Sequence, residues 1–175
     1  MATHYFTASS LDGFIATPEN SLDWLLNQKI DPAGPMSYQR FERTIGALAM
    51  GATTYEWVRT NDPGPWGYEQ PTWVFTHRRL TLPAGADVRL TSADVREVHA
   101  QMEAAAGGKD LWVVGGGDLA VQFADAGLLD EVLVQFAPVT LGAGAPLLPR
   151  AIDLELLEVA RNESFLCGRY RVLRD

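Results

Sequence analysis

The chain has 175 residues, of which 47% are hydrophobic, and a formal net charge of −8 at pH 7. These values predict one globular protein with a substantial core and argue against a general nucleic-acid surface. The single cysteine, Cys167, excludes an intrachain disulfide and a zinc site built from several thiolates, and no metal site is expected. The N-terminus resembles no signal peptide and no apolar run is long enough to span a bilayer, so we expect a cytoplasmic protein without a membrane partner.

Short apolar runs alternate with segments of helical periodicity along the chain. In chain order, we expect a strand over residues 5–8, a helix over 37–48, a strand over 47–50, a helix over 53–59, strands over 73–76 and 88–90, a helix from 91 to about 106, a strand over 111–114, a helix over 118–126, and strands over 131–139, 154–159 and 165–173. Residues 10–20 and 61–70 are rich in turn-forming residues and predict loops. Thr53 or Thr54 could cap one helix, and residues 91–94 resemble a capping box.

This order predicts an α/β fold with three layers, α-β-α. Its mostly parallel mixed sheet would be covered on both faces, and its C-terminal strands would be antiparallel. No linker divides the chain, so residues 1–175 are expected to form a single domain. In such sheets, ligands bind beyond the C-terminal ends of the strands. Three segments that follow strands would lie there: residues 51–54, 76–78 and 115–117.

Three consecutive glycines, at residues 115–117, separate an apolar run from a helical segment. They remove every Cβ from the loop, and the helix that follows offers unpaired N–H groups and a partial positive charge. Such a loop can cradle a phosphate, but it can equally be a turn that needs positive φ and close packing. Gly51, Thr53 and Thr54 form a second strand–glycine–helix junction, which would offer a second phosphate site.

Thr76, His77 and Arg78 also follow a strand directly. A guanidinium group suits a phosphate monoester, such as the 2′-phosphate of NADPH. A solvated turn would carry the same residue types, so both interpretations of this segment stay open.

Five motifs follow one another along the chain, at residues 10–16, 50–56, 73–78, 111–117 and 128–148. Together they resemble the dihydrofolate reductase-like fold, and within it the C-terminal reductase domain of bacterial bifunctional deaminase-reductases of riboflavin biosynthesis and its stand-alone relatives. The resemblance implies an NADPH-dependent oxidoreductase that transfers a hydride to a C=N or C=O bond of a small heteroaromatic substrate. The implied cofactor-binding residues are Ala8, Ile15, Gly51, Thr53, Thr54, Thr76, His77, Arg78, Thr91, Val114, Gly115, Gly116, Gly117, Asp118 and Leu119. It also implies a homodimer, which would cover the apolar C-terminal strands.

Reduction of such a bond needs a hydride on one face and a proton for the heteroatom. The candidate acid–base residues are Asp12 and Asp23, although Asp12 precedes a glycine as in a turn and Asp23 could be an N-cap. Candidate substrate contacts are Trp24, Tyr38, Phe41 and Gln135, although aromatic residues at such spacing are often core residues.

Two departures from the family pattern bear on the substrate. The helix expected after residue 35 begins without a carboxylate, which argues against folate reduction. Residues 54–59 replace an Asp-x-Pro segment that shapes a ribosyl-phosphate site in the riboflavin-pathway reductases, which argues against a ribosylaminopyrimidine substrate. The alternatives are a nucleotide-binding module of the same fold without catalytic activity and a purely structural domain.

Overall fold

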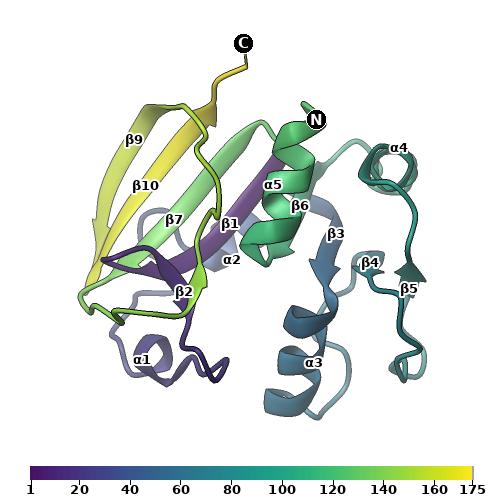
Figure 1. Cartoon of the computed structure of the whole chain (residues 1–175), viewed down its shortest axis with the longest axis horizontal. Coiled ribbons are helices and arrows are strands. Elements are labelled where there is room, and N and C mark those ends of the chain that lie inside the picture. The colour runs from purple at the N-terminus through teal and green to yellow at the C-terminus, as the bar shows by residue number, and fades with distance from the viewer. Residues whose placement is uncertain (175) are drawn as a thin grey trace.

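An eight-stranded sheet forms the centre of the computed structural model, which describes residues 1–174 (Figure 1). Its strands are β1 (Thr3–Ser10), β3 (Ile45–Gly51), β4 (Thr72–Phe75), β5 (Val88–Thr91), β6 (Asp110–Gly115), β7 (Glu131–Ala137), β9 (Leu154–Asn162) and β10 (Phe165–Val172). They lie in the order β5-β4-β3-β6-β1-β7-β10-β9. The pairs from β5 to β7 are parallel, and β10 is antiparallel to both β7 and β9. The predicted mixed sheet with antiparallel C-terminal strands is therefore confirmed.

Helices cover both faces of this sheet. They are α1 (Asp23–Leu26), α2 (Tyr38–Glu42), α3 (Ala52–Asn61), α4 (Val95–Ala105) and α5 (Gly117–Asp125). Tyr5 of β1 packs in the core cluster beneath α4 and α5, whereas the next residue, Phe6, packs with Phe41 of α2. Because neighbouring strand residues point to opposite faces, α2 lies on the face opposite α4 and α5. The three predicted layers are thus present, and burial on both faces explains the continuous apolar runs in the sequence.

The helix expected over residues 37–48 ends at residue 42, so this prediction is wrong beyond that point. Phe41, Ile45 and Leu48 do share one core cluster, which accounts for their spacing, but Ile45 and Leu48 belong to β3. A Cβ at Gly46 would overlap the backbone of Ala106, just after α4, so β3 passes close to the end of that helix. Tertiary packing has therefore overridden the local periodicity.

Residues 10–20 are not only a loop. They contain β2 (Phe14–Ala16), which pairs with β8 (Ala145–Pro146) in a second, two-stranded sheet. The backbone N–H of Leu147 also donates to the carbonyl of Gly13, at 2.8 Å. These contacts join segments about 130 residues apart along the chain and place both beside the C-terminal ends of the parallel strands (Figure 1).

Two expected helix caps differ from prediction. Helix α4 is capped by Asp94, whose carboxylate accepts a hydrogen bond from the N–H of Arg96 at 2.8 Å, rather than by Thr91. Helix α3 begins at Ala52 with Gly51 as its N-cap, so Thr53 and Thr54 lie inside the helix. Gly51 makes no side-chain cap, which leaves the first N–H groups of α3 available to a ligand.

Candidate active site

Two glycine turns meet where β3 and β6 end. Met50 pairs with Gly115 across these strands, and α3 and α5 begin directly after them. A Cβ at Gly51 would lie 3.8 Å from the oxygen of Gly115 and 4.0 Å from the nitrogen of Gly116. Neither N-cap, Gly51 or Gly116, supplies a side-chain hydrogen bond to its helix. Two helix N-termini, each with unpaired N–H groups and partial positive charge, therefore lie side by side.

The three consecutive glycines have different structural reasons. Gly115 has φ +147°, and a cis peptide bond joins it to Gly116. A Cβ at Gly117 would lie 2.5 Å from the carbonyl oxygen of Leu147 and 2.6 Å from that of Pro146, so α5 packs against β8 without room for a side chain. At Gly116, in contrast, φ is −84°, and an added Cβ would make only an ordinary contact, at 3.7 Å from the Cδ1 of Ile15. Turn geometry and close packing account for Gly115 and Gly117, but space remains at Gly116.

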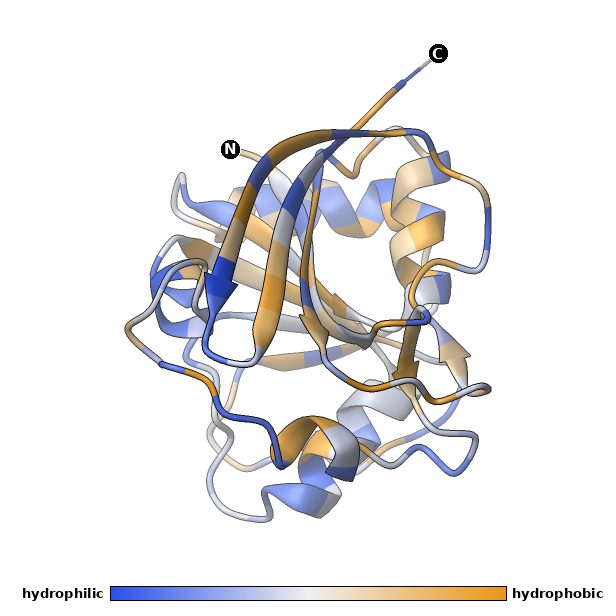
Figure 2. Ribbon diagram, turned by 90° about the vertical axis from the view of Figure 1, so that its left-hand side faces the viewer, coloured by the Kyte–Doolittle hydropathy of each residue, from blue (hydrophilic) through white to orange (hydrophobic). Residues whose placement is uncertain are grey.

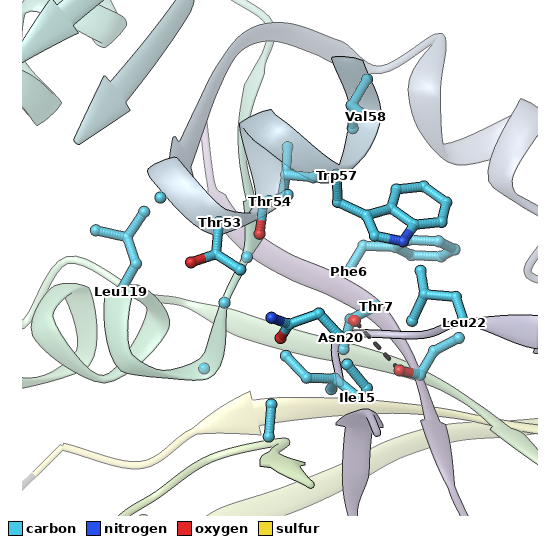
Figure 3. Close-up of a pocket in the computed structure, with 18 of the residues that line it drawn as sticks. Phe6, Thr7, Ile15, Asn20, Leu22, Thr53, Thr54, Trp57, Val58 and Leu119 are labelled. Carbon is cyan, nitrogen blue, oxygen red and sulfur yellow. Dashed lines mark hydrogen bonds between the residues drawn. The ribbon is translucent and has the colours of Figure 1, made fainter. Parts of the chain in front are cut away.

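A cleft of about 890 Å³ opens beside these turns (Figure 3). It gathers most of the residues expected at the cofactor: Ala8, Ile15, Gly51, Thr53, Thr54, Val114, Gly115, Gly116, Gly117, Asp118 and Leu119. Two expected substrate contacts, Tyr38 and Gln135, also line it. In Figure 3, Asn20 lies between Thr53 at the glycine end and Leu22 towards the other end. The cleft thus joins the glycine turns to a more distant apolar region.

Thr76, His77, Arg78 and Thr91 are not among the cleft-lining residues. Thr76, His77 and Arg78 follow the end of β4 and Thr91 is the last residue of β5; the N–H of Thr76 donates to the carbonyl of Thr91 at 2.8 Å. Phe75 pairs with Gly51, so this group continues the same sheet edge. His77 and Arg78 are exposed, and both outer nitrogens of the Arg78 guanidinium donate to the Glu56 carboxylate, at 3.2 and 2.8 Å.

The two candidate acid–base residues also lie outside the cleft lining. Asp12 accepts hydrogen bonds from the Ser10 hydroxyl at 2.6 Å and from the N–H groups of Leu141 and Gly142 at 3.0 and 2.7 Å. These bonds, led by that of Ser10, lower the pKa of Asp12 to about 2. A carboxylate that is ionised at neutral pH and held in this way anchors the segment that leads to β8, and it is poorly suited to donate a proton.

Asp23 is the first residue of α1 and is exposed. The N-cap is Leu22, so the N-cap interpretation of Asp23 is wrong.

Two of the four aromatic and polar residues expected at the substrate pack elsewhere. Trp24 packs against the cluster of Phe165 and Cys167, and Phe41 stacks on Phe6 with ring centroids 4.5 Å apart. Neither Trp24 nor Phe41 lines the cleft. Phe41 is thus a core residue and Trp24 is partly buried against the core, which is the alternative that their spacing left open.

Sequence reasoning missed much of the apolar part of the cleft. The missed lining residues include Phe6, Thr7, Asn20, Leu22, Trp57, Tyr68 and Trp112. Phe6 and Trp112 lie on the face of β1 and β6 opposite the α5 core, so strand alternation combined with the predicted strand order could have identified them. Asn20 carries a signal of another kind, since it has φ +60°, a conformation that asparagine tolerates better than most residues.

No helix in residues 1–174 has the length and apolar character that crossing a bilayer requires. Within the same residues, no group of three His, Cys, Asp or Glu side chains is arranged to hold a metal ion.

Comparison with known proteins identifies the family. The sequence profile of the RibD C-terminal domain matches residues 4–168, and the chain therefore belongs to this family. The protein YwjB of Bacillus subtilis (strain 168), described as uncharacterized, is 31% identical over 164 residues, which cover 93% of this chain and 91% of YwjB. YyaP of the same organism, also described as uncharacterized, is 25% identical over 177 residues and covers 95% of this chain and 90% of its own.

Solved structures agree with this assignment. A putative riboflavin biosynthesis protein from Shewanella sp. PV-4 superposes with a TM-score of 0.83 at 27% identity, covering 99% of this chain and 100% of that one. A diaminohydroxyphosphoribosylaminopyrimidine deaminase/5-amino-6-(5-phosphoribosylamino)uracil reductase from Thermotoga maritima shares the fold, with a TM-score of 0.66 at 15% identity over 98% of this chain and 56% of that one. The resemblance inferred from the motifs is confirmed, and the family supports a reductase-type enzyme.

Proposed function

We propose that the protein is an NADPH-dependent reductase that transfers a hydride to a C=N or C=O bond of a small heteroaromatic compound. The observation that carries the proposal is the pair of glycine-capped helix N-termini on one wall of the cleft, with space left at Gly51 and Gly116. A dinucleotide pyrophosphate suits such a place, because N–H groups and helix dipoles favour anions. Membership of the RibD C-terminal domain family supports the same reading.

Different residues at this sheet edge would bind different parts of the cofactor. Thr53 and Thr54 in the first turn of α3, with Gly116 and Gly117 at the start of α5, would hold the pyrophosphate. Asp118 and Leu119 follow in the same helix turn, and Val114 precedes it. Ala8 and Ile15 would line the nicotinamide, which supplies the hydride when bound, while Tyr38 and Gln135 orient the substrate and a proton from solvent completes the reduction.

The adenosine end would lie along β4 and β5. Arg78 would exchange Glu56 for the 2′-phosphate of NADPH, with Thr76 and His77 beside it and Thr91 next to the adenine. Both side chains of the Arg78–Glu56 pair are about half exposed, and such pairs contribute only about 0–1 kcal/mol, so the exchange costs little.

Calorimetric titration with NADPH and NADH tests the proposal. We expect NADPH to bind more tightly, and Arg78→Gln to weaken NADPH at least tenfold while changing NADH little. Arg150→Gln is the matched control, since Arg150 pairs with Asp125 at the surface and lines no part of the cleft. Failure of the folded protein to bind either nucleotide would contradict the proposal.

A nucleotide-binding module without catalytic activity is the second candidate. The observation in its favour is that neither Asp12 nor Asp23 lines the cleft, where the only carboxylate among the described lining residues is that of Asp118. A protein that binds NADPH but oxidises none of it, across a broad panel of carbonyl and imine compounds, would favour this candidate.

A homodimer completes the proposal. Strand β9 is at the sheet edge, and Leu156, Val159 and Leu166 on β9 and β10 are 57%, 61% and 52% exposed. Val159 lies opposite Gly168, two residues from Leu166, so the side chains of Val159 and Leu166 share one face. Figure 2 views this edge of the sheet and shows hydrophobic residues in both of its strands. We expect a dimer by sedimentation at micromolar concentration and a monomer for Val159→Lys. A monomeric parent protein would contradict this part.

A further inference from the structure

The end of the cleft away from the glycine turns is lined mainly by large apolar side chains. We call this region the aromatic chamber and define it by Phe6, Leu22, Tyr38, Trp57, Tyr68 and Trp112. The ring of Trp112 lies 5.7 Å from that of Tyr38 and 5.9 Å from that of Tyr68, measured between centroids. The indole N–H of Trp112 donates to the carbonyl of Phe6 at 3.1 Å, which fixes the ring. Such a wall offers apolar faces and edges to a planar ring.

The aromatic chamber belongs to a cleft whose described lining holds no cationic side chain. Among the described residues that line the cleft there is no Lys, Arg or His, and the only charged one is Asp118 at the start of α5, in the glycine turn. Burial, together with the nearby Glu42 and Asp62 carboxylates, raises the pKa of Tyr68 to about 12. Burial also raises the pKa of Tyr38, with Tyr68 and Glu42 contributing. Both hydroxyls therefore stay neutral at physiological pH.

The polar groups of the cleft wall near the aromatic chamber are neutral as well. Gln135 donates from Nε2 to the carbonyl of Met36 at 3.1 Å, which holds its carboxamide in place. Asn20 is held in a turn by its own N–H, which donates to the carbonyl of Thr17 at 2.9 Å, and its carboxamide lies in the cleft (Figure 3). Amide groups match the carbonyl and N–H edges of an uncharged ring.

A phosphate monoester in the aromatic chamber would lose hydration and gain no cation in return. Burial of an unpaired charge is strongly unfavourable, and the nearby carboxylates would add repulsion. At the glycine end, in contrast, two helix N-termini favour an anion. The two ends of one cleft therefore select opposite kinds of group.

We propose that the compound reduced by this protein is an uncharged, planar ring compound that carries no phosphate. The proposal rests on the proposed function, because the aromatic chamber adjoins the hydride donor only if NADPH binds at the glycine turns. The proposed substrate differs from that of the Thermotoga maritima protein, whose name gives a phosphoribosyl compound as its substrate.

Matched ligand pairs that differ only by a phosphate test the proposal. The protein is first saturated with NADP⁺, so that the glycine turns cannot capture the phosphate of the second ligand. Riboflavin and FMN, pyridoxal and pyridoxal 5′-phosphate, and uridine and UMP are then titrated by calorimetry. We expect at least tenfold tighter binding of the uncharged member in each pair that binds. Equal or tighter binding of phosphorylated members, or no binding of any uncharged member, overturns the proposal.

The saturation step keeps the two proposals apart. If NADP⁺ itself does not bind, the proposed function fails. If NADP⁺ binds and the phosphorylated ligands bind as tightly as their uncharged partners or more tightly, only the inference about the substrate fails.

A gain-of-charge variant tests the electrostatic reasoning directly. Leu26 lines the cleft and is 64% exposed, so Leu26→Lys places an ammonium group there without disturbing the core. We expect it to tighten binding of the phosphorylated ligand at least fivefold and to leave its uncharged partner unchanged. Leu173→Lys is the control, since Leu173 is 48% exposed and lies outside the cleft lining. An equal effect on both ligands, or the same effect from the control, overturns the electrostatic reasoning.

Discussion

The variant Gly51→Ala tests whether Gly51 is needed for ligand binding or only for the turn between β3 and α3. Gly51 has φ −80° and ψ 166°, which alanine adopts without strain. Its added methyl group would meet only ordinary contacts, at 3.8 Å from the oxygen of Gly115 and 4.0 Å from the nitrogen of Gly116. The variant should therefore fold, with the methyl group projecting into the space between the two helix N-termini.

We expect Gly51→Ala to change the free energy of unfolding much less than the affinity for NADPH. Alanine is a poorer N-cap than glycine by less than about 1 kcal/mol, and the stiffer unfolded chain offsets about 0.4–1 kcal/mol, so the free energy of unfolding should change little. One lost hydrogen bond to a charged phosphate costs about 1.5–3 kcal/mol. Since about 1.4 kcal/mol is a factor of ten, NADPH binding should weaken about 10- to 150-fold.

Urea unfolding and NADPH calorimetry on the same preparation measure both quantities. Gly117→Ala is the comparison for stability alone, because Gly117 also belongs to the proposed pyrophosphate site: its Cβ would lie 2.5 Å from the oxygen of Leu147, and such overpacking should cost about 1–3 kcal/mol of stability. The reasoning is refuted if Gly51→Ala binds NADPH as tightly as the parent protein does.

Three further changes test other parts of the structure. Gly46→Ala would drive a methyl group into the backbone of Ala106, and a cost of about 3 kcal/mol should lower Tm by about 6–12 °C in a thermal scan; an unchanged Tm would contradict the close approach of β3 to α4. The pKa of Asp12 is lowered in the folded protein, so the stabilisation by its carboxylate is complete above the pKa of the unfolded chain and is lost as pH falls towards 2. The difference in unfolding free energy between the parent protein and Asp12→Asn should therefore shrink over that pH range. A difference that stays constant would argue against the anchoring role of Asp12. Asn162 is buried and bonds to the backbone of Asp31 and Pro35, so Asn162→Leu should cost about 2–3 kcal/mol by denaturant unfolding, and a neutral result would mean that the loop before α2 is held otherwise.

The sequence by itself determined the class of fold and the glycine end of the cleft. Strands that are buried on both faces read as continuous apolar runs, and residues 111–114 and 131–137 were recognisable for that reason. The residues around Gly51 and Gly116 were also found, because a glycine between a strand and a helix is a local pattern. Parallel strands then bring both turns to the same sheet edge whatever the distant contacts are.

Tertiary structure alone decided the rest of the site. Asp12 became an anchor because Leu141 and Gly142 lie against it, about 130 residues further along the chain. Phe41, Ile45 and Leu48 pack in one core cluster, but pairing with neighbouring strands places Ile45 and Leu48 in β3 rather than in the expected helix. The aromatic chamber joins side chains from β1, β6, α2, α3 and two loops. No local pattern encodes such a wall, because its shape and charge depend on which distant segments meet.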